Sequence, residues 1–408
     1  AQPVTVDSQA VVLAPHKKTL YAVSIPSGEI RWRFPSQSRS TTPLSERSRA
    51  EIRAAIGELG VSDGERQSLE QRVEAATVGG DGLKALKEAV DASTAPDDAK
   101  KRLKGLIDER ARVEKKGVDK VKALYGGLGV SSDGATAYVP TYGGRVYALD
   151  IATGRPLWVE DLGSQIIGGV AVDGATLYVG TRKGDLFALS AETGERRKIF
   201  HGRGEIWAAP TVADGQIYLT SLDGSLYKLD AEGKQIWRFG TNSGVASRAV
   251  VSNDRVYVGS YDNHLYAVSA ENGTEMWSVK AGNWFWSEPI VRDEVVYAAS
   301  LDGKVYAADA ETGKPRWDQP FDTGSPIRSG LAASGGSLIV GARNGSIYRV
   351  NLSDGAAAGA SLQIGTRLES DLTTGSDGRI YVVPRESTLW IIDAEGTLLA
   401  GEHYALPD

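Results

Sequence analysis

The sequence predicts an all-β fold: an eight-bladed β-propeller of four-stranded blades, with an α-helical segment inserted between blades 1 and 2. Three observations predict it. A unit of about 40 residues occurs eight times, turn signals separate short alternating strands inside each unit, and one stretch of the chain lacks aromatic residues. The 408 residues would otherwise fit two or three domains of ordinary size, but an all-β barrel or propeller can be longer as a single unit.

The repeated unit is clearest around a polar turn that ends in glycine. It reads LYAVSIPSGEIRW at 20–32, VYALDIATGRPLW at 146–158 and VYAADAETGKPRW at 305–317. The eight turn glycines are Gly28, Gly154, Gly194, Gly233, Gly273, Gly313, Gly355 and Gly396. Their separations are 39–42 residues, except for a first gap of 126. An insertion of about 86 residues therefore interrupts a regular array of repeats.

Each unit contains the elements of one blade. Alternating segments such as IYLT and VYVGS lead into turns such as LDGS and YDNH, then into an aromatic strand and the glycine turn. Asp-Gly and Asn-Gly pairs favour tight hairpins, because their residues tolerate the positive φ that such turns require. Four short strands in each unit of about 40 residues are typical of a propeller blade.

Two sets of aromatic residues recur at fixed distances from the turn glycine. One set lies six or seven residues before it: Tyr21, Tyr147, Phe187, Tyr227, Tyr266, Tyr306, Tyr348 and Trp390. The other set lies four residues after it: Trp32, Trp158, Trp237, Trp277 and Trp317. Large flat rings suit the wedge between twisted sheets, so we interpret both sets as packing between neighbouring blades.

The A-E-T-G-x-x-x-W units, preceded by D-G-x-L-Y-A-L, resemble the pyrroloquinoline-quinone-type propeller repeat. The count of eight units is similar to that of the propeller lipoproteins of the outer-membrane β-barrel assembly machinery. The resemblance implies a non-catalytic, extracytoplasmic scaffold whose partners are envelope or outer-membrane proteins. The repeat residues themselves predict architecture, because a fold of this kind carries many functions.

The sequence divides into blade 1 at 1–43, a helical segment at 44–125 and blades 2–8 at 126–408. All 31 aromatic residues lie outside 44–124. We expect three or four helices there. Thr42-Pro43 is one start signal, Ser62-Asp63-Gly64-Glu65 is a capping-box pattern, and Thr94-Ala95-Pro96-Asp97 opens a last helix reaching about Leu124.

The last helix has apolar residues at helical spacing, and we expect this stripe to face the other helices. Its members are Leu103, Leu106, Ile107, Val113, Val121 and Leu124. Two interpretations of the segment remain open. It is either an arm that docks a partner protein or a solvated bundle with no partner.

Composition excludes several classes of function. The net charge of −6 argues against nucleic acid as the main partner, and no apolar run is long enough to span a bilayer. The absence of cysteine excludes disulfides and thiolate metal sites. The sequence has no N-terminal cysteine to acylate, unless one directly precedes residue 1. The chain begins with alanine and no leader follows, so we expect any export signal to have been removed.

Chemistry-bearing motifs are sparse. The histidines, His16, His201, His264 and His403, show no metal-ligand spacing, and we expect all four on the surface with no metal bound. The repeat also resembles that of the quinoprotein alcohol dehydrogenases, a family that holds its cofactor with calcium and an adjacent-cysteine disulfide ring. Because this chain has no cysteine, we expect no cofactor, and a quinone-dependent dehydrogenase is the least favoured alternative.

The loops that enter the innermost strand of each blade should line one end of the central channel. They read GEIWAAP at 204–210, SGVASRA at 243–249, NWFWSEP at 283–289, SPIRSGL at 325–331 and TRLESDL at 366–372. The candidate binding residues in them are Trp207, Arg248, Trp284, Trp286, Glu288, Arg328, Arg367 and Asp371. Aromatic residues mixed with arginines are typical of hot spots for binding proteins or peptides.

Alternative interpretations of these residues stay open. Arg248 and Glu288, in adjacent blades, would pair across the mouth while the tryptophans plug it. A small-ligand or glycan-binding propeller would use Trp207, Trp284 and Trp286 as a stacking platform. A structural subunit of another envelope complex is a third possibility.

Overall fold

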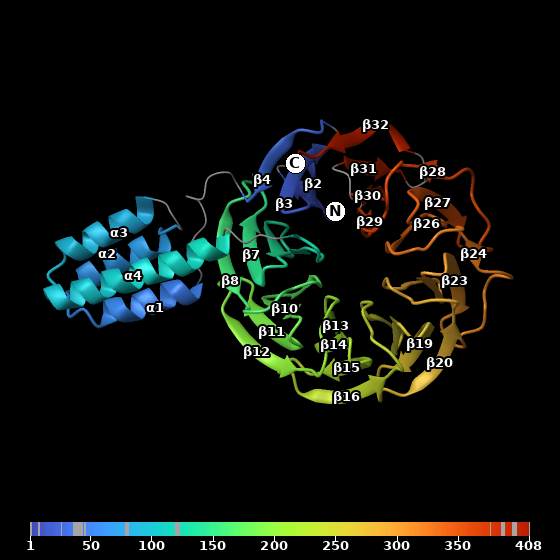
Figure 1. The fold of residues 1–408 in the computed structure, drawn as a ribbon, viewed down its shortest axis with the longest axis horizontal. Helices are drawn as coiled ribbons and strands as arrows, with labels where there is room; N and C mark the ends of the chain where they lie inside the picture. Colours follow the sequence, from blue (N-terminus) through green and yellow to red (C-terminus); the bar gives the residue numbers. More distant parts are fainter. Residues whose placement is uncertain are drawn as a thin grey trace.

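A computed structural model describes residues 2–6, 9–25, 27–35, 44, 46–77, 81–118, 123–375, 377–384, 388–393 and 398–407. Eight four-stranded antiparallel sheets stand in a ring around a central axis (Figure 1). Within each sheet the strands follow chain order, from the axis outward to the rim. The predicted eight-bladed propeller is confirmed.

The first four blades contain sixteen strands: β1 (Gln2–Val6), β2 (Gln9–His16), β3 (Thr19–Ile25), β4 (Ile30–Phe34), β5 (Gly129–Val130), β6 (Thr136–Pro140), β7 (Arg145–Asp150), β8 (Pro156–Asp161), β9 (Val170–Asp173), β10 (Thr176–Gly180), β11 (Asp185–Ser190), β12 (Arg196–His201), β13 (Thr211–Ala213), β14 (Gln216–Ser221), β15 (Ser225–Leu229) and β16 (Gln235–Gly240). The last four contain β17 (Val250–Ser252), β18 (Arg255–Gly259), β19 (His264–Ser269), β20 (Glu275–Lys280), β21 (Ile290–Arg292), β22 (Val295–Ala299), β23 (Lys304–Asp309), β24 (Phe321–Asp322), β25 (Leu331–Ser334), β26 (Ser337–Gly341), β27 (Ser346–Asn351), β28 (Leu362–Gln363), β29 (Thr373–Thr374), β30 (Ile380–Val382), β31 (Thr388–Ile392) and β32 (Leu398–Ala405).

The turn between the second and third strands explains part of the repeat. In blade 5 the Asp262 carboxylate accepts the backbone N–H of His264 at 3.0 Å and the hydroxyl of Tyr266 at 2.8 Å. Blades 4 and 6 repeat the tyrosine contact, at Asp223 and Asp302. The third-strand tyrosine therefore fixes its own hairpin turn, in addition to its place in the blade core.

In five of the eight units, a tryptophan after the glycine turn joins its blade to the next one. Its indole N–H donates to a backbone carbonyl three residues before the next turn glycine. The bonds are Trp32 to Ile151 (2.7 Å), Trp158 to Ala191 (3.0 Å), Trp237 to Ala270 (3.1 Å), Trp277 to Ala310 (3.1 Å) and Trp317 to Leu352 (3.0 Å). Each such bond contributes about 1 kcal/mol net.

The same indole rings lie directly on the turn glycine of the next blade. A methyl group at Gly313, for example, would lie 2.7 Å from the Trp277 ring, and Gly154, Gly194, Gly273 and Gly355 have equivalent contacts. Gly313 also has a φ of +70°, which L side chains rarely adopt. Only glycine therefore suits this position, for two independent reasons.

Three interfaces depart from this pattern. Unit 3 has Lys198 at the tryptophan position, and there the backbone of Ile199 lies against Gly233. Unit 7 has Gly359 at that position, and the turn glycine of the next unit, Gly396, lies outside the described residues. At the closure of the ring, the side chain of Tyr404 covers Gly28 and the Tyr21 hydroxyl donates to the carbonyl of Pro407 at 2.5 Å. Buried side chains of blades 1 and 8 share one apolar cluster. The two ends of the chain thus close the ring by packing, without sharing a strand between sheets.

Between blades 1 and 2 the described chain forms four helices: α1 (Glu46–Gly57), α2 (Asp63–Glu74), α3 (Asp81–Ala92) and α4 (Asp97–Val118). The expected capping box is present, because Ser62 and Glu65 exchange side-chain and backbone hydrogen bonds. Glu65 also accepts from Thr94, and these bonds lower its pKa to about 2. The predicted start at Thr42-Pro43 lies outside the described residues.

The last helix is shorter than predicted. It ends at Val118, which makes it about 33 Å long. Leu103 and Ile107 lie in the helical core and Leu106 packs against it, as the stripe predicts. Leu124 was wrongly assigned to the helix: it is non-helical and packs against the core between blades 1 and 2. The side chains of Val113 and Val121 lie outside the described set.

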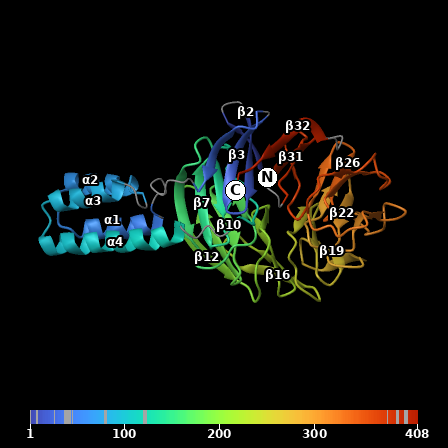
Figure 2. The same cartoon turned by 45° about the horizontal axis from the view of Figure 1, so that its top comes forward.

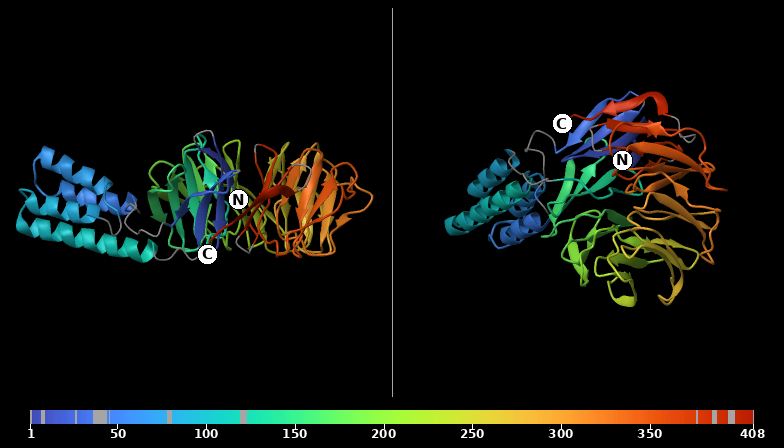
Figure 3. Two further views of the ribbon diagram at one scale, coloured as in Figure 1. Left: turned by 90° about the horizontal axis from the view of Figure 1, so that it is seen from above. Right: turned by 45° about the vertical axis from the view of Figure 1, so that its right-hand side comes forward.

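The four helices form a bundle with an apolar core of its own. It projects from the rim of the disc beside blades 1 and 2, and its nearest propeller strand is β8 (Figures 1 and 2). Seen edge-on, the bundle extends sideways from the disc (Figure 3). No described helix is long and apolar enough to cross a membrane.

The contact between Trp277 and Gly313 can be tested with a matched pair of glycines. Gly313 and Gly324 have φ values of +70° and +68°, but open space surrounds only Gly324. We expect Gly313→Ala to lower the free energy of unfolding by about 1–3 kcal/mol more than Gly324→Ala, because its methyl group displaces an indole. Urea unfolding followed by tryptophan fluorescence measures both; equal losses would contradict the assigned contact.

Candidate functional site

The candidate site is a cavity of about 390 Å³ at the mouth of the central channel. Residues of three-residue segments at successive blade entries line it, and we call these segments the mouth triplets: 125–127, 167–169, 207–209, 246–248, 286–288, 328–330 and 369–371. Their first residues are Tyr125, Ile167, Trp207, Ala246, Trp286, Arg328 and Glu369. Their third residues are Gly127, Gly169, Ala209, Arg248, Glu288, Gly330 and Asp371.

A buried apolar residue positions each triplet from 167–169 onward. These anchors are Ile166, Ile206, Val245, Phe285, Ile327 and Leu368, all at most 1% exposed. The backbone N–H of Phe285, for example, donates to the Ser260 carbonyl at 3.3 Å, and Gly259 leaves room for the Cβ atom and backbone of Phe285. Since neighbouring residues of an extended segment point to opposite sides, the residue after each anchor faces the channel.

Aromatic rings form the centre of the site. The Tyr261 ring stacks against Trp284 at 4.4 Å and against Trp286 at 5.5 Å between centroids. Trp207 meets Trp286 edge-on at 6.4 Å, and the Arg328 guanidinium lies 4.3 Å from the centroid of Trp286. Desolvation raises the pKa of Tyr261 to about 12. Trp286 is therefore already engaged by three neighbours, while Trp284 stays 40% exposed.

An ion pair connects these rings to the helical segment. Arg182 donates to both carboxylate oxygens of Glu205, at 2.8 and 2.9 Å, and the Trp207 indole donates to Glu205 at 2.6 Å. Arg182 also donates to the Tyr142 hydroxyl, whose ring meets Tyr125 edge-on. Tyr125 belongs to the segment returning from the helices and is 68% exposed.

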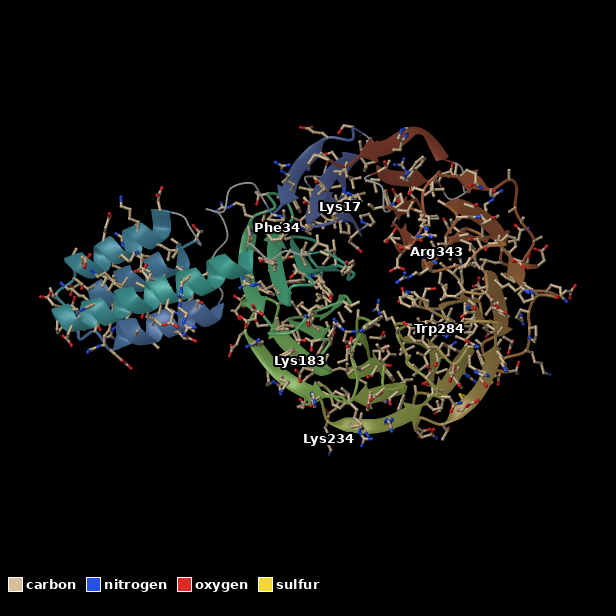
Figure 4. All side chains as sticks on the ribbon, viewed as in Figure 1. Lys17, Phe34, Lys183, Lys234, Trp284 and Arg343 are labelled. Carbon is tan, nitrogen blue, oxygen red and sulfur yellow. The ribbon has the colours of Figure 1, made fainter. Side chains whose placement is uncertain are left out.

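On the opposite flank, Glu369 joins two arginines. Its Oε1 lies 3.1 Å from Arg343 and 3.9 Å from Arg328. In Figure 4, Trp284 and Arg343 lie near the central opening, whereas Lys234 lies at the outer rim. Contacts thus run continuously around much of the mouth. We call the participating residues the mouth belt: Tyr125, Tyr142, Arg182, Glu205, Trp207, Tyr261, Trp284, Trp286, Arg328, Arg343 and Glu369.

Arg248, Glu288 and Asp371 occupy the third position of their triplets, and all three are exposed. Arg248 lies 3.9 Å from Glu288, so the alternative of a pair between adjacent blades has a geometric basis, although the contact is longer than a hydrogen bond. The Nε of Arg248 donates to Thr211 instead. Desolvation by the surrounding loops raises the pKa of Glu288 although its side chain is 47% exposed, Arg248 lowers it, and the like charge of Asp371 raises it again.

Six of the eight sequence-predicted residues line the cavity: Trp207, Arg248, Trp286, Glu288, Arg328 and Asp371. Trp284 lies beside it, stacked on Tyr261. Arg367 is exposed and does not line it. Sequence reasoning missed Glu369, although it shares the alignment column of Trp286. It also missed the second-to-third-strand turns, where Tyr142, Arg182, Tyr261 and Arg343 occupy one repeat position.

Of the three tryptophans in the stacking-platform alternative, only Trp284 has an exposed ring, because Trp286 is covered by its neighbours and Trp207 is half-buried.

One expectation about the histidines is wrong: His16 is buried at the end of β2, not on the surface. A calcium-held quinone requires clustered acidic ligands. The described residues contain no group of three or more His, Asp or Glu side chains that could hold a metal ion, so they do not fit that cofactor and we derive no chemistry through it.

The Arg182–Glu205 pair predicts a pH response at Trp207. Hydrogen bonds from Arg182 hold the pKa of Glu205 below the usual 4.5. The stabilisation is therefore complete above pH 4.5 and is lost as the pH falls through the lowered folded-state value. We expect Arg182→Met to move the acid midpoint of the Trp207 indole N–H resonance to higher pH. Arg203→Met, on an exposed residue outside the belt, should leave it in place. An unchanged midpoint in Arg182→Met would argue against the pair.

Comparisons with known proteins agree with this architecture. The family model of the outer membrane protein assembly factor BamB matches residues 107–196, 142–244, 223–360 and 301–399. The solved structure of BamB from Moraxella catarrhalis has a TM-score of 0.59 at 20% identity, over 69% of this chain and 88% of that one. The computationally designed Ika8 protein has a TM-score of 0.58 at 17% identity, over 70% of this chain and 84% of that one.

At these identities the two solved structures support the fold alone. A search among curated proteins finds no match. The family model is stronger evidence of family membership, because its overlapping matches extend from residue 107 to residue 399, well over half of the chain. The chain therefore belongs to the family of the outer membrane protein assembly factor BamB.

Proposed function

We propose that this protein is a non-catalytic scaffold of the bacterial envelope, outside the cytoplasm, which holds protein partners while outer-membrane complexes assemble. Membership of the BamB family supports the setting. The observation that carries the proposal is the mouth belt. It places exposed aromatic rings beside ion-paired arginines around one cavity, which is the composition of protein-binding hot spots.

Rigidity is the physical basis of such a scaffold. Every belt residue except Tyr125 lies on a short loop or turn between strands, and hydrophobic anchors at most 1% exposed fix the triplets from 167–169 onward. Because the belt side chains already contact one another, a partner would meet them close to their bound positions. Binding then costs little ordering entropy, which favours a stable complex from a modest surface.

The helical arm supports the same proposal as a second contact. It has its own apolar core and projects from the rim. Its return segment presents Tyr125 at the mouth. A partner that reaches the mouth near blade 2 would therefore meet the base of the arm as well.

The proposal predicts the effect of a double substitution at the channel mouth. The wild-type protein, immobilised and exposed to detergent-solubilised envelope membranes, should retain envelope proteins that bare resin does not. Combining Trp284→Ala with Tyr125→Ala should reduce this capture at least tenfold, because both rings are exposed hot-spot candidates.

Matched controls lie on the outer rim, at Leu157 in β8 and Met276 in β20, which are 46% and 45% exposed. Leu157→Ala combined with Met276→Ala should leave capture unchanged. Loss of capture in the rim variant with retention in the mouth variant would reject the mouth as the binding surface. Capture no greater than that of bare resin would reject the scaffold function itself.

A further inference from the structure

Outside the cavity, a second ring of side chains surrounds the channel mouth. In five blades, a residue of the second-to-third-strand turn donates its backbone N–H to the carbonyl of the residue just before the anchor. These bonds join Arg182 to Gln165, Leu222 to Glu205, Tyr261 to Gly244, Leu301 to Trp284 and Arg343 to Pro326, each at 2.9 Å. We call these ten residues, together with Arg367 before the anchor of blade 8, the outer ring. None of them lines the cavity.

Three junctions of the outer ring show how neighbouring blades meet there. The Arg182 side chain of blade 3 binds Glu205 of blade 4 at 2.8 Å. A Cβ atom at Gly244 of blade 5 would lie 3.2 Å from the Leu222 side chain of blade 4. The Tyr261 ring of blade 5 stacks on Trp284 of blade 6. At each junction, the turn residue of one blade thus meets the residue before the anchor of the next blade.

From blade 4 to blade 7 the outer ring is apolar. This sector consists of Leu222, Gly244, Tyr261, Trp284, Leu301 and Pro326. Trp284 is 40% exposed, Pro326 is exposed, and Leu222 and Leu301 are half-buried. Contiguous exposed apolar surface with a charged border is typical of an interaction site. Because Tyr261 covers one face of the Trp284 indole, a second aromatic ring would stack on the opposite face.

The junction that follows the apolar sector holds two arginines. Arg343 and Arg367 occupy the repeat positions that hold the ion pair of Arg182 and Glu205 in blades 3 and 4. Figure 4 shows Arg343 beside the central opening, on the same side as Trp284. The sector is therefore apolar around Trp284 and cationic at its far border.

The two arginines differ in how their charge is compensated. Arg343 has the Glu369 carboxylate at 3.1 Å, and Arg328 approaches the same carboxylate at 3.9 Å. The nearby Asp371 carboxylate accepts the Gly330 backbone N–H. Arg367 is exposed, and the described residues place no carboxylate at ion-pair distance from it. An anionic group of a partner would complement this charge.

We propose that the outer ring binds an extended segment of the partner polypeptide, which stacks an aromatic side chain on Trp284 and pairs a carboxylate with Arg367. This inference rests on the proposed function and names the chemistry that the partner must offer. The two contacts give the bound segment a direction, with its aromatic residue at blade 6 and its acidic residue at blade 8. A basic segment would instead meet Arg343 and Arg367 as like charges.

The test uses the full chain and synthetic peptides. Each peptide carries one phenylalanine and two glutamates, separated by two, four or six glycine and serine residues. At least one spacing should shift the Trp284 indole N–H resonance saturably. Replacing its phenylalanine with alanine should weaken binding at least tenfold, because the stacked ring is lost. Replacing its glutamates with glutamines should weaken binding about two- to fivefold, as expected for an exposed ion pair.

The peptide series also defines what would overturn the proposal. A peptide with lysines in place of the glutamates should bind more weakly than the glutamine peptide. Stronger binding of the lysine peptide, or unchanged affinity without the phenylalanine, would contradict the proposed chemistry. Maltotriose, the probe for a sugar ligand, should cause no saturable shift. Saturation by the sugar with no response to any peptide would assign the Trp284 surface to glycans instead.

Variants locate the binding, with affinities measured by calorimetry. Trp284→Ala should weaken binding of the best peptide at least tenfold. Arg367→Gln should weaken it about two- to fivefold and give the glutamate and glutamine peptides equal affinity. The control is Arg203→Gln, at an exposed arginine in the entry loop of blade 4, which should keep the preference for glutamate. The same preference in Arg367→Gln, with a preserved circular dichroism spectrum, would reject the assigned carboxylate contact.

The two proposals fail separately. If the wild type captures envelope proteins but binds no peptide of the series, the outer-ring site is wrong and the scaffold stands. If the peptides bind as expected and no envelope protein is captured, the scaffold is wrong.

Discussion

The ring depends on one recurring contact, in which the indole of one blade lies on the turn glycine of the next and donates to a nearby carbonyl. The contact appears at five interfaces with donor distances of 2.7–3.1 Å. Its members lie 33–35 residues apart in the uninterrupted repeats, and 119 apart across the insertion. The same geometry on both sides of the helical segment explains how the ring accommodates it: the segment replaces a loop and leaves the interface intact.

A fixed ring makes the channel mouth a place where residues from many blades meet. Each triplet follows a buried anchor, so its backbone path is constrained while its side chains vary. Tryptophan, arginine, glutamate and alanine occupy the same position in successive blades. The scaffold thus separates architecture from recognition: glycines, anchors and rim tryptophans hold the shape, and the triplets and strand turns carry the chemistry.

The helical segment is part of this mouth as well as an appendage. Its return segment brings Tyr125 against Tyr142, and from there contacts continue through Arg182 and Glu205 to Trp207. Leu124 packs into the core between blades 1 and 2. The base of the arm is therefore fixed to the propeller by apolar packing and by the belt, whereas its helices pack on one another.

The period of the glycines and tryptophans determined the eight blades, because packing between blades requires these residues at fixed spacing. The capping box and the aromatic-free stretch likewise predicted the helices, although helix α4 ends at Val118 and Leu124 joins the propeller core. These features are local or periodic, and a single sequence displays both. For the site, the repeat alignment found the channel-facing columns, including Trp207, Trp286 and Arg248.

Only the tertiary structure decided which of those side chains meet. Tyr261 stacks on two tryptophans from a different loop, and Glu369 joins two arginines of different turns. The Ser287 hydroxyl has no hydrogen-bond partner among the described residues, although it has the same local sequence position as three bonded serines. Such contacts depend on the direction of each side chain across the ring, which spacing along the chain does not specify.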